Sequence, residues 1–516
     1  MRNHILNDLY RVIKKCPDKI AYSDGETQLT FSDVYKQSRS IGSYLSQKGI
    51  YKKPIVIFMK KSPLEIAAFF GVITGGNFYV PIDEEMPGQR IQMIFDQVQP
   101  PLIICDETTK EAVKNFQIKD CEIKQYRDLI QTEINDLALT EIYHNSIDTD
   151  PIYIVFTSGS TGVPKGVVAC HRSVMDYIEQ LSEILEFDEN TIFGNQAPLY
   201  FDACLKEIYP TLKFGATTYL IPKQCFSFPI SLVEFLNKYK INTICWVVSA
   251  LTMVSAVGTF DSVKPEFLRT VAFGSEVFPI KQLKLWREAL PEATFTNLYG
   301  PTESTGMCCF YRVEKELEEG DVVPIGHPFP NREILLLSED GKVVPYGGQG
   351  EICVRGTALT LGYYNDPERT KAVFVQNPLH SLYPELIYRT GDIGRYNKEG
   401  ELCFVSRKDD QIKHMGHRIE LGEIEVNANT LAGVRMAACV FDREKNKIVL
   451  FYVGDITEKD LIAEMKRVLP RYMLPNRMIR LDEMPFTANG KIDRVKLKNK
   501  IEDEGDKNGR VTEDFK

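Results

Sequence analysis

The sequence has no excess of positive charge, no long apolar run and no metal-type spacing of cysteine or histidine. Its 62 lysines and arginines are outnumbered by 71 aspartates and glutamates, and the net charge of −9 argues against a broad basic face for nucleic acid. No stretch approaches the roughly 20 apolar residues that cross a membrane, and the start lacks the apolar core of a signal peptide. Twelve scattered cysteines form no CxxC pair, and seven histidines form no HExxH motif, so a zinc hydrolase is excluded. We therefore expect a cytoplasmic protein with reduced thiols that binds neither nucleic acid nor membrane.

The length of the chain, 516 residues, predicts more than one domain, because a single hydrophobic core seldom grows that large. Strand-like apolar runs at 54–59, 78–82 and 101–105 alternate with amphipathic stretches such as 63–73. This alternation is typical of an α/β fold with mixed or parallel sheets flanked by helices. A charged cluster at 408–410 marks the expected boundary between a large domain at 1–407 and a small α+β domain at 408–500. Residues 501–516 are almost all charged or small, which predicts a disordered tail.

The most informative stretch is 153–167, which reads YIVFTSGSTGVPKGV. An apolar, β-branched run at 153–156 predicts a buried strand. Glycines then alternate with small hydroxyl residues, a pattern that turns backbone N–H groups and hydroxyls toward phosphate oxygens. We predict a phosphate-binding loop built from Thr157, Ser158, Gly159, Thr161, Gly162 and the mobile charge of Lys165. It is not a Walker loop, because Gly166 follows Lys165. A flexible linker is the alternative, but linkers rarely separate two apolar runs.

Further motifs follow in order: NLYGPTE at 297–303, YRTGD at 388–392 and NGKIDR at 489–494. With the loop at 157–165, these stretches make the chain similar to the adenylate-forming superfamily. Within it, the sequence resembles the amino-acid adenylation domains of non-ribosomal peptide synthetases and the D-alanine–carrier-protein ligases. The resemblance extends from about residue 29 to 491. It implies a large N-terminal domain and a mobile C-terminal lid, with the active site between them.

The resemblance also implies that ATP and Mg²⁺ are used, and it assigns roles to single residues. Lys491 is the expected catalytic lysine, Thr302 contacts the α-phosphate, Glu303 coordinates Mg²⁺ and His171 is an aromatic gate. Nucleotide contacts are implied for the phosphate loop and for Gly274, Ser275, Glu276, Asn297, Tyr299 (stacked on adenine), Gly300, Asp392 and Arg407 (on the ribose and adjacent phosphate). Asp409 is the expected hinge, although Ser406 replaces the family's glycine nearby. From charge alone Lys491 could be one more solvated lysine, and His171 could be structural.

Asp202, in Phe201-Asp202-Ala203-Cys204, points to the branch of the family that activates amino acids. There the aspartate pairs with the substrate α-ammonium, which supplies the partner that a buried carboxylate needs. The motif register places a side-chain pocket at Ala203, Lys206, Cys245, Val271, Phe273, Leu298, Gly306 and Met307. Phe273 stands where the family often has a small residue, so we expect a shallow or reshaped pocket. Lys206 either points inward toward an anion or polar acceptor, or extends outward along the pocket wall.

No Gly-Gly-x-Ser phosphopantetheine site follows the last motif. We therefore expect a stand-alone enzyme that activates a small amino acid as aminoacyl-AMP and passes it to the phosphopantetheine thiol of a separate carrier protein. The first alternative is an acyl- or aryl-acid CoA ligase, which shares the first half-reaction. The second is a non-catalytic nucleotide-binding protein with the same fold, against which the joint presence of Lys165, Glu303, Asp392, Arg407 and Lys491 argues.

Overall fold

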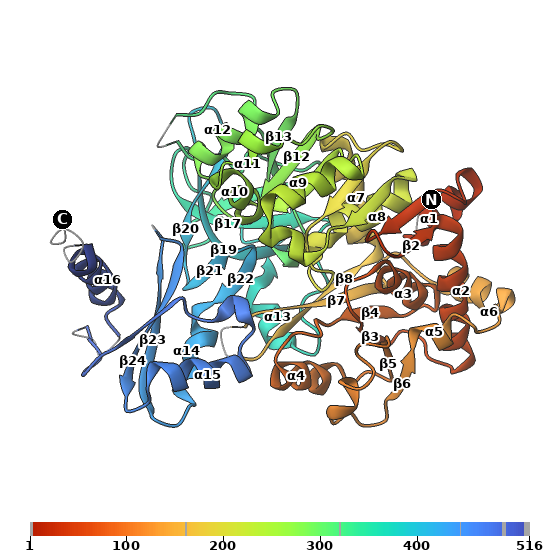
Figure 1. The fold of residues 1–516 in the computed structure, drawn as a ribbon, viewed down its shortest axis with the longest axis horizontal. Coiled ribbons are helices and arrows are strands. Elements are labelled where there is room, and N and C mark those ends of the chain that lie inside the picture. The colour runs from red at the N-terminus through yellow and green to blue at the C-terminus, as the bar shows by residue number, and fades with distance from the viewer. Residues whose placement is uncertain (1–3, 160–161, 319–320, 444, 488–491, 510–516) are drawn as a thin grey trace. The chain divides into compact units, whose positions relative to one another are not determined.

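The alternating segments build two large sheets, a smaller antiparallel sheet and a separate C-terminal α+β region (Figure 1). The computed structural model describes residues 4–159, 162–318, 321–443, 445–487 and 492–509. Their contacts group into two units. The first unit contains residues up to Glu84, Phe95–Phe156 and Gly166–Lys408; the second contains Glu85–Ile94, Thr157–Lys165 and the chain from Asp409 onward.

The largest sheet of the first unit has nine strands. Its six central strands are parallel, and its outer strands β2, β14 and β15 are antiparallel to their neighbours. In spatial order the strands are β15 (His327–Pro328), β14 (Cys309–Arg312), β13 (Thr294–Tyr299), β12 (Thr270–Gly274), β11 (Thr243–Val247), β9 (Ile192–Asn195), β10 (Thr217–Leu220), β1 (Ile20–Ser23) and β2 (Gln28–Thr30).

A second sheet has six strands and a third has five. The six-stranded order is β6 (Glu122–Gln125), β5 (Leu102–Cys105), β3 (Pro54–Phe58), β4 (Phe78–Pro81), β7 (Pro151–Thr157) and β8 (Lys165–Cys170). The antiparallel five-stranded sheet contains β16 (Arg332–Leu337), β17 (Gly350–Gly356), β19 (Leu386–Tyr396), β18 (Phe374–Gln376) and β20 (Leu402–Arg407). Strands β3, β4 and β5 are buried along their whole length, as their continuous apolar sequence predicts.

Helices flank the large sheets and bury their apolar faces between them. They are α1 (Leu6–Lys15), α2 (Phe31–Gln47), α3 (Pro63–Thr74), α4 (Gly88–Val98), α5 (Tyr126–Leu129), α6 (Asp136–Asn145), α7 (His171–Ile184), α8 (Leu205–Phe214), α9 (Pro229–Lys238), α10 (Val248–Ala256), α11 (Thr259–Ser262), α12 (Ile280–Ala289) and α13 (Pro367–Val373).

Local sequence fixes where these helices begin. Thr30 and Asp33 form a reciprocal capping box that starts α2, and Ser62 followed by Pro63 starts α3. Almost every residue of α3 is buried, and the helix packs against α2 in the main core.

The second unit is a small α+β assembly. It contains the hairpin β21 (Gln411–His414) and β22 (His417–Glu420), and a sheet of β23 (Val434–Asp442), β24 (Lys447–Gly454) and β25 (Arg477–Arg480). Helices α14 (Leu421–Asn429) and α15 (Glu458–Val468) cover one face of that sheet, and α16 (Arg494–Gly509) covers the other (Figure 1). The predicted α/β fold class, with mixed and parallel sheets and a small C-terminal α+β region, is confirmed.

Helix α16 begins at Arg494 and continues to Gly509, into the segment for which the sequence predicts a disordered tail. Leu497 and Ile501 stand one helical turn apart, and both are buried against Val440, Val449 and Phe451. This apolar pair packs the first turns of the helix on the sheet. The disordered tail at 501–516 stays a prediction.

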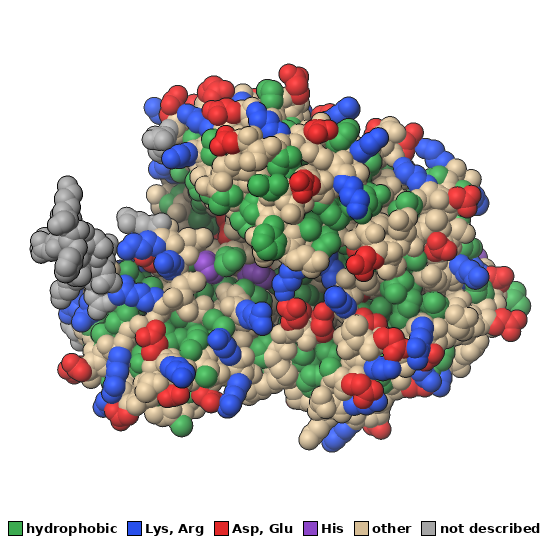
Figure 2. Space-filling model, viewed as in Figure 1, with side chains coloured by type: hydrophobic (Ala, Val, Ile, Leu, Met, Phe, Trp, Pro, Cys, Tyr) green, Lys and Arg blue, Asp and Glu red, His purple; other side chains and the backbone are tan. Residues whose placement is uncertain are grey.

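On the face of the protein in Figure 2, acidic and basic side chains are interspersed. Within the described ranges, no helix combines the length and the apolar character that a membrane crossing requires.

We predict that Leu497→Ala releases α16 from its sheet. Removing a buried leucine side chain costs about 2–5 kcal/mol, which exceeds what a short helix contributes without packing. Amide hydrogen exchange across 494–509 should therefore accelerate, while exchange in α2 and α3 stays unchanged. Lys498→Ala, at an exposed position on the same helix, is the matched control. Equal protection of α16 in the two variants would show that Leu497 does not anchor it.

Candidate active site

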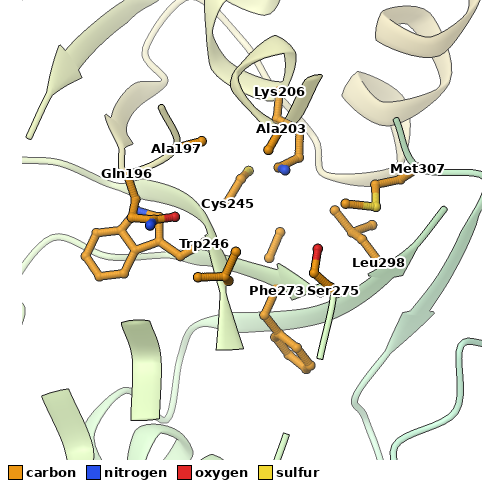
Figure 3. Close-up of a pocket in the computed structure, with 13 residues that line it drawn as sticks. Gln196, Ala197, Ala203, Lys206, Cys245, Trp246, Phe273, Ser275, Leu298 and Met307 are labelled. Atoms are coloured by element: carbon orange, nitrogen blue, oxygen red, sulfur yellow. The ribbon is translucent and has the colours of Figure 1, made fainter. Parts of the chain in front are cut away.

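Neighbouring parallel strands β9, β11, β12 and β13 end at one edge of the nine-stranded sheet, where open α/β sheets bind ligands. A pocket lies there, with a volume of about 10 Å³, room for roughly one water molecule. Its lining comes from the ends of these strands and from the start of α8 (Figure 3). The lining residues are Gln196, Ala197, Ala203, Lys206, Cys245, Trp246, Val247, Ala272, Phe273, Gly274, Ser275, Leu298 and Met307.

Most of the predicted pocket residues meet in this space. Ala203, Lys206, Cys245, Phe273, Leu298 and Met307 line it, together with Gly274 and Ser275, which were expected on the nucleotide. Val271 and Gly306 do not line it. The residues that sequence reasoning missed are Gln196, Ala197, Trp246, Val247 and Ala272. Ala272 could have been predicted from the sequence, because side chains alternate between the two faces of a strand and residue 272 therefore faces the opposite way from residues 271 and 273.

That alternation corrects the prediction for Val271 and Phe273. Both side chains belong to the core on the opposite face of the sheet from Cys245, Ala272 and Leu298. The Phe273 ring packs edge to face on Phe278 at 4.9 Å and points away from the pocket (Figure 3). The pocket is therefore not made shallow by the Phe273 ring.

Lys206, the second residue of α8, points inward. Only 5% of the residue is exposed, and its amine is directed into the pocket (Figure 3). Of the two orientations that the sequence left open, the structure has the inward one.

Asp202 begins the short helical turn Asp202–Cys204 beside the pocket, and it is partly buried. Its carboxylate is close enough to act on two buried tyrosines: burial raises the pKa of Tyr153 and Tyr177 well above the usual range, and the charge of Asp202 raises them further. A carboxylate in these surroundings favours a cationic partner.

A buried network joins three predicted nucleotide-binding residues. Strands β19 and β20 pair so that Asp392 lies opposite Arg407, and their side chains form an ion pair at 2.6 Å. The Tyr299 hydroxyl donates a hydrogen bond to the other Asp392 oxygen, and burial followed by the Asp392 charge raises the pKa of Tyr299. The polar groups expected on the ribose are thus held together before a nucleotide arrives.

Glu303 lies fully buried in the turn after β13, next to the half-buried Thr302. The Tyr363 hydroxyl donates to the Glu303 carboxylate at 2.7 Å. Glu276 accepts a hydrogen bond from the Ser249 backbone at 2.8 Å, and the Asn297 amide donates to the Pro324 carbonyl at 2.8 Å.

Two predicted glycines are required by close backbone packing. A side chain on Gly274 would place its Cβ 2.3 Å from the Leu298 carbonyl oxygen, and one on Gly300 would meet the Gly306 oxygen at 2.2 Å. Both separations are far below van der Waals contact, so these positions admit only glycine.

The phosphate loop belongs to the second unit, where the side of α14 approaches it. The Gly159 backbone N–H donates to the Glu423 carboxylate at 3.2 Å, and the Ser158 hydroxyl donates to the Arg418 carbonyl at 2.8 Å. The buried Thr157 hydroxyl has no hydrogen-bond partner among the described residues. A carboxylate on one loop N–H and an unsatisfied hydroxyl beside it fit a site built for anions.

Two charged residues in this region differ from expectation. Lys165 is not a mobile charge: it begins β8, is buried, and its ammonium lies 3.9 Å from the Glu420 carboxylate. Arg90, which sequence reasoning missed, forms a buried ion pair with Glu423. No local motif marks Arg90, since its partner lies more than 300 residues away. Thr161 and Lys491 lie outside the described residues.

His171 begins α7 and is buried in the first unit, where its ring packs on His4 at 4.1 Å. The Ile5 backbone N–H donates to its Nδ1 at 3.4 Å. These contacts with the N-terminal segment favour the structural alternative for His171. Asp409, the expected hinge, accepts a hydrogen bond from the Gln411 backbone and is the first residue after the break between the two units.

The chain belongs to the AMP-binding enzyme family, whose model matches residues 9–364. It is a member of the adenylate-forming superfamily of the non-ribosomal peptide synthetase adenylation type, as the sequence motifs predict. Membership of this family implies the use of ATP.

Curated relatives resemble the chain over nearly its whole length. It is 30% identical to the D-alanine–D-alanyl carrier protein ligase of Listeria welshimeri, over 97% of this chain and 100% of that protein. It is 32% identical to surfactin synthase subunit 1 of Bacillus subtilis over 91% of this chain, and it spans 13% of that much longer protein. The solved structure of the Vibrio cholerae adenylation domain AlmE with glycyl-adenosine-5'-phosphate has the same fold, with a TM-score of 0.83, 20% identity and 98% of each chain covered.

The buried histidine pair predicts how stability depends on pH. Burial lowers the pKa of His4 to about 4, whereas the unfolded imidazole binds a proton near pH 6.5. The folded state therefore loses stability as the pH falls from 6.5 toward 4, and His4 accounts for about 3 kcal/mol of that loss. For His4→Phe, the free energy of unfolding measured with a denaturant should fall by correspondingly less between pH 6.5 and pH 4. His144→Gln, at an exposed position, should follow the unaltered protein. A drop in His4→Phe as large as in the unaltered protein would mean that His4 is solvated.

Proposed function

We propose that this chain activates an amino acid with ATP, forming aminoacyl-AMP and pyrophosphate, and then transfers it to the phosphopantetheine thiol of a carrier protein. The observation that carries the amino-acid assignment is the placement of Asp202. Its carboxylate stands at the entrance of α8, one residue before Ala203 in the pocket wall, among buried tyrosines. A carboxylate there pairs with the substrate α-ammonium, and the side chain of the amino acid enters the pocket.

The first half-reaction needs the substrate carboxylate held against the α-phosphate of ATP. One carboxylate oxygen bonds to the α-phosphorus, the bond from that phosphorus to the bridging oxygen breaks, and pyrophosphate leaves. Positioning and charge stabilisation supply most of the rate in such transfers. Asp202 orients the amino acid, Thr302 and Lys491 act on the carboxylate and α-phosphate, and the loop at 157–165 receives the phosphates. Asp392 and Arg407 hold the ribose.

Glu303 is the proposed ligand of Mg²⁺. The described residues contain no cluster of three or more histidine, cysteine, aspartate or glutamate side chains that could hold a metal alone. A single buried carboxylate still fits Mg²⁺, which is commonly bound by one or two carboxylates with substrate phosphates and water. When bound, the ion offsets the negative charge of the triphosphate.

A carrier protein is the proposed thiol acceptor. The name of the Listeria welshimeri relative, which this chain matches from end to end, includes a carrier protein. Rotation at Asp409, between a large domain at 1–407 and a lid from 408, would exchange the adenylation and thiol-transfer arrangements.

We expect Asp202→Asn to raise the KM for the best amino acid by roughly 10- to 100-fold, because a hydrogen-bonded charge pair is lost. The KM for ATP should change little, and des-amino analogues should be rejected less strongly. ATP–pyrophosphate exchange with varied amino acid and varied ATP measures both constants. Asp340→Asn, at an exposed position, serves as the control. An unchanged KM for the amino acid would contradict the pairing of Asp202 with the α-ammonium and would favour the alternative function, an acyl- or aryl-acid CoA ligase.

Lys491→Ala should lower the rate of pyrophosphate exchange by about 10²–10³, the usual effect of removing one charge-stabilising donor. ATP binding, followed by calorimetry, should remain, since the loop at 157–165 is intact. Lys500→Ala removes a neighbouring exposed lysine and should exchange normally. A normal rate of pyrophosphate exchange by Lys491→Ala would mean that Lys491 has no catalytic role and is an ordinary solvated lysine.

A further inference from the structure

The ammonium of Lys206 is the least expected group in the pocket. The residue is 95% buried, and its side chain is aimed into a small space whose other walls are largely apolar. None of the hydrogen bonds and ion pairs among the described residues involves this ammonium, although its charge acts on the adjacent Glu207 carboxyl and lowers the pKa of that group. A buried charge without a partner is unfavourable, so a ligand that supplies an anion there gains affinity.

The charged neighbours of Lys206 do not neutralise it. Glu207 is next to it on α8; burial raises the pKa of Glu207 to about 7 even though the Lys206 charge lowers it, so this carboxyl is partly protonated at neutral pH and offsets the Lys206 charge only in part. That carboxyl also accepts a hydrogen bond from the Asn195 amide at 3.3 Å.

Two further groups near Lys206 leave the local net charge positive. The Lys61 ammonium donates to the backbone carbonyls of Gln196 and Ala197 at 3.2 and 2.9 Å. Desolvation lowers the pKa of Lys61 to about 8, and it remains mainly cationic at neutral pH. Burial raises the pKa of the Cys245 thiol well above its usual range, so this thiol is neutral.

We infer that the amino acid activated by this enzyme carries a side-chain carboxylate, which pairs with the Lys206 ammonium inside the pocket. The inference rests on the proposed function, because it takes Asp202 as the partner of the α-ammonium. Asp202 begins the turn Asp202–Cys204 that precedes α8, and Lys206, four residues later, is the second residue of α8, so the two ends of one small molecule can reach both. Together they select an α-cation and a side-chain anion on the same substrate.

Space in the pocket supports a short acidic side chain. A volume of about 10 Å³ holds roughly one water molecule, so any substrate side chain enters only as the walls move, and a leucine or phenylalanine side chain needs the larger movement. A carboxylate on one or two methylene groups needs less space, and pairing with Lys206 offsets the loss of its water.

The decisive experiment is ATP–pyrophosphate exchange by the full chain with matched pairs of amino acids. Aspartate is compared with asparagine, glutamate with glutamine, and alanine and leucine represent uncharged side chains. We expect kcat/KM for aspartate or glutamate to exceed that for the corresponding amide by at least tenfold. Higher activity with an amide or an apolar amino acid would overturn the inference and leave the proposed function standing. Exchange with no amino acid at all would overturn both.

Lys206→Met tests the residue itself, because methionine keeps most of the volume and removes the charge. We expect KM for the acidic amino acid to rise roughly 10- to 100-fold, as for loss of a hydrogen bond to a charged group, and the preference over the amide to disappear. Lys213→Met is the matched control: it lies on the same helix, and its ammonium pairs with Glu179 at 2.7 Å away from the pocket. An unchanged ranking in Lys206→Met would overturn the role of Lys206. If this variant does not fold, the ranking of the unaltered enzyme still decides the inference.

Discussion

The parallel hydrogen bonding of β9, β11, β12 and β13 is the constraint on which the candidate site depends. In-register pairing makes these four neighbours end at one edge, so the segments that follow them must meet there. Residues as distant in the chain as Gln196 and Met307 share one pocket for this reason. The start of α8 closes the pocket from the side with Ala203 and Lys206. The chemistry of the site can therefore vary along these strand ends while the sheet that carries them stays the same.

Charges buried in the two units are mostly matched by partners. Asp392 has Arg407 and Tyr299, Glu303 has Tyr363, and Arg90 has Glu423. Such pairs contribute little net stability, but removing one partner leaves an uncompensated charge and is strongly unfavourable. Each pair thus fixes the geometry of a polar group in advance, which lowers the reorganisation needed when a ligand binds. Among the described residues no comparable hydrogen bond or ion pair involves the Lys206 ammonium, and this is why we connect it with a ligand.

Several strands could be predicted because a strand that is buried on both faces consists of consecutive apolar residues. The predicted runs 54–59, 78–82 and 101–105 correspond to β3, β4 and β5. The motifs also located the pocket through Cys245, Leu298 and Met307. Motif spacing alone did not give the facing of Val271 and Phe273, because it counts positions and ignores which face of a strand each one occupies. The Arg90–Glu423 pair and the His4–His171 contact could not be predicted either, since long-range packing creates them. Composition also gave no sign that Leu497 and Ile501, one turn apart in a charged segment, pack on the C-terminal sheet.

The crowding around Gly274 and Gly300 has a consequence for attempts to change what the enzyme accepts. Gly274 lines the pocket and Gly300 directly follows β13, and the backbone opposite each of them lies within 2.3 Å of where a first side-chain carbon would stand. Substitution there would push adjoining strands apart and disturb every residue at that edge, whatever the new side chain was. Ala272 and Cys245 also line the pocket, and each already carries a first side-chain carbon that the surrounding backbone accommodates. Substitutions intended to change the preferred substrate should therefore be made at the small side chains that line the pocket, and Gly274 and Gly300 should be kept.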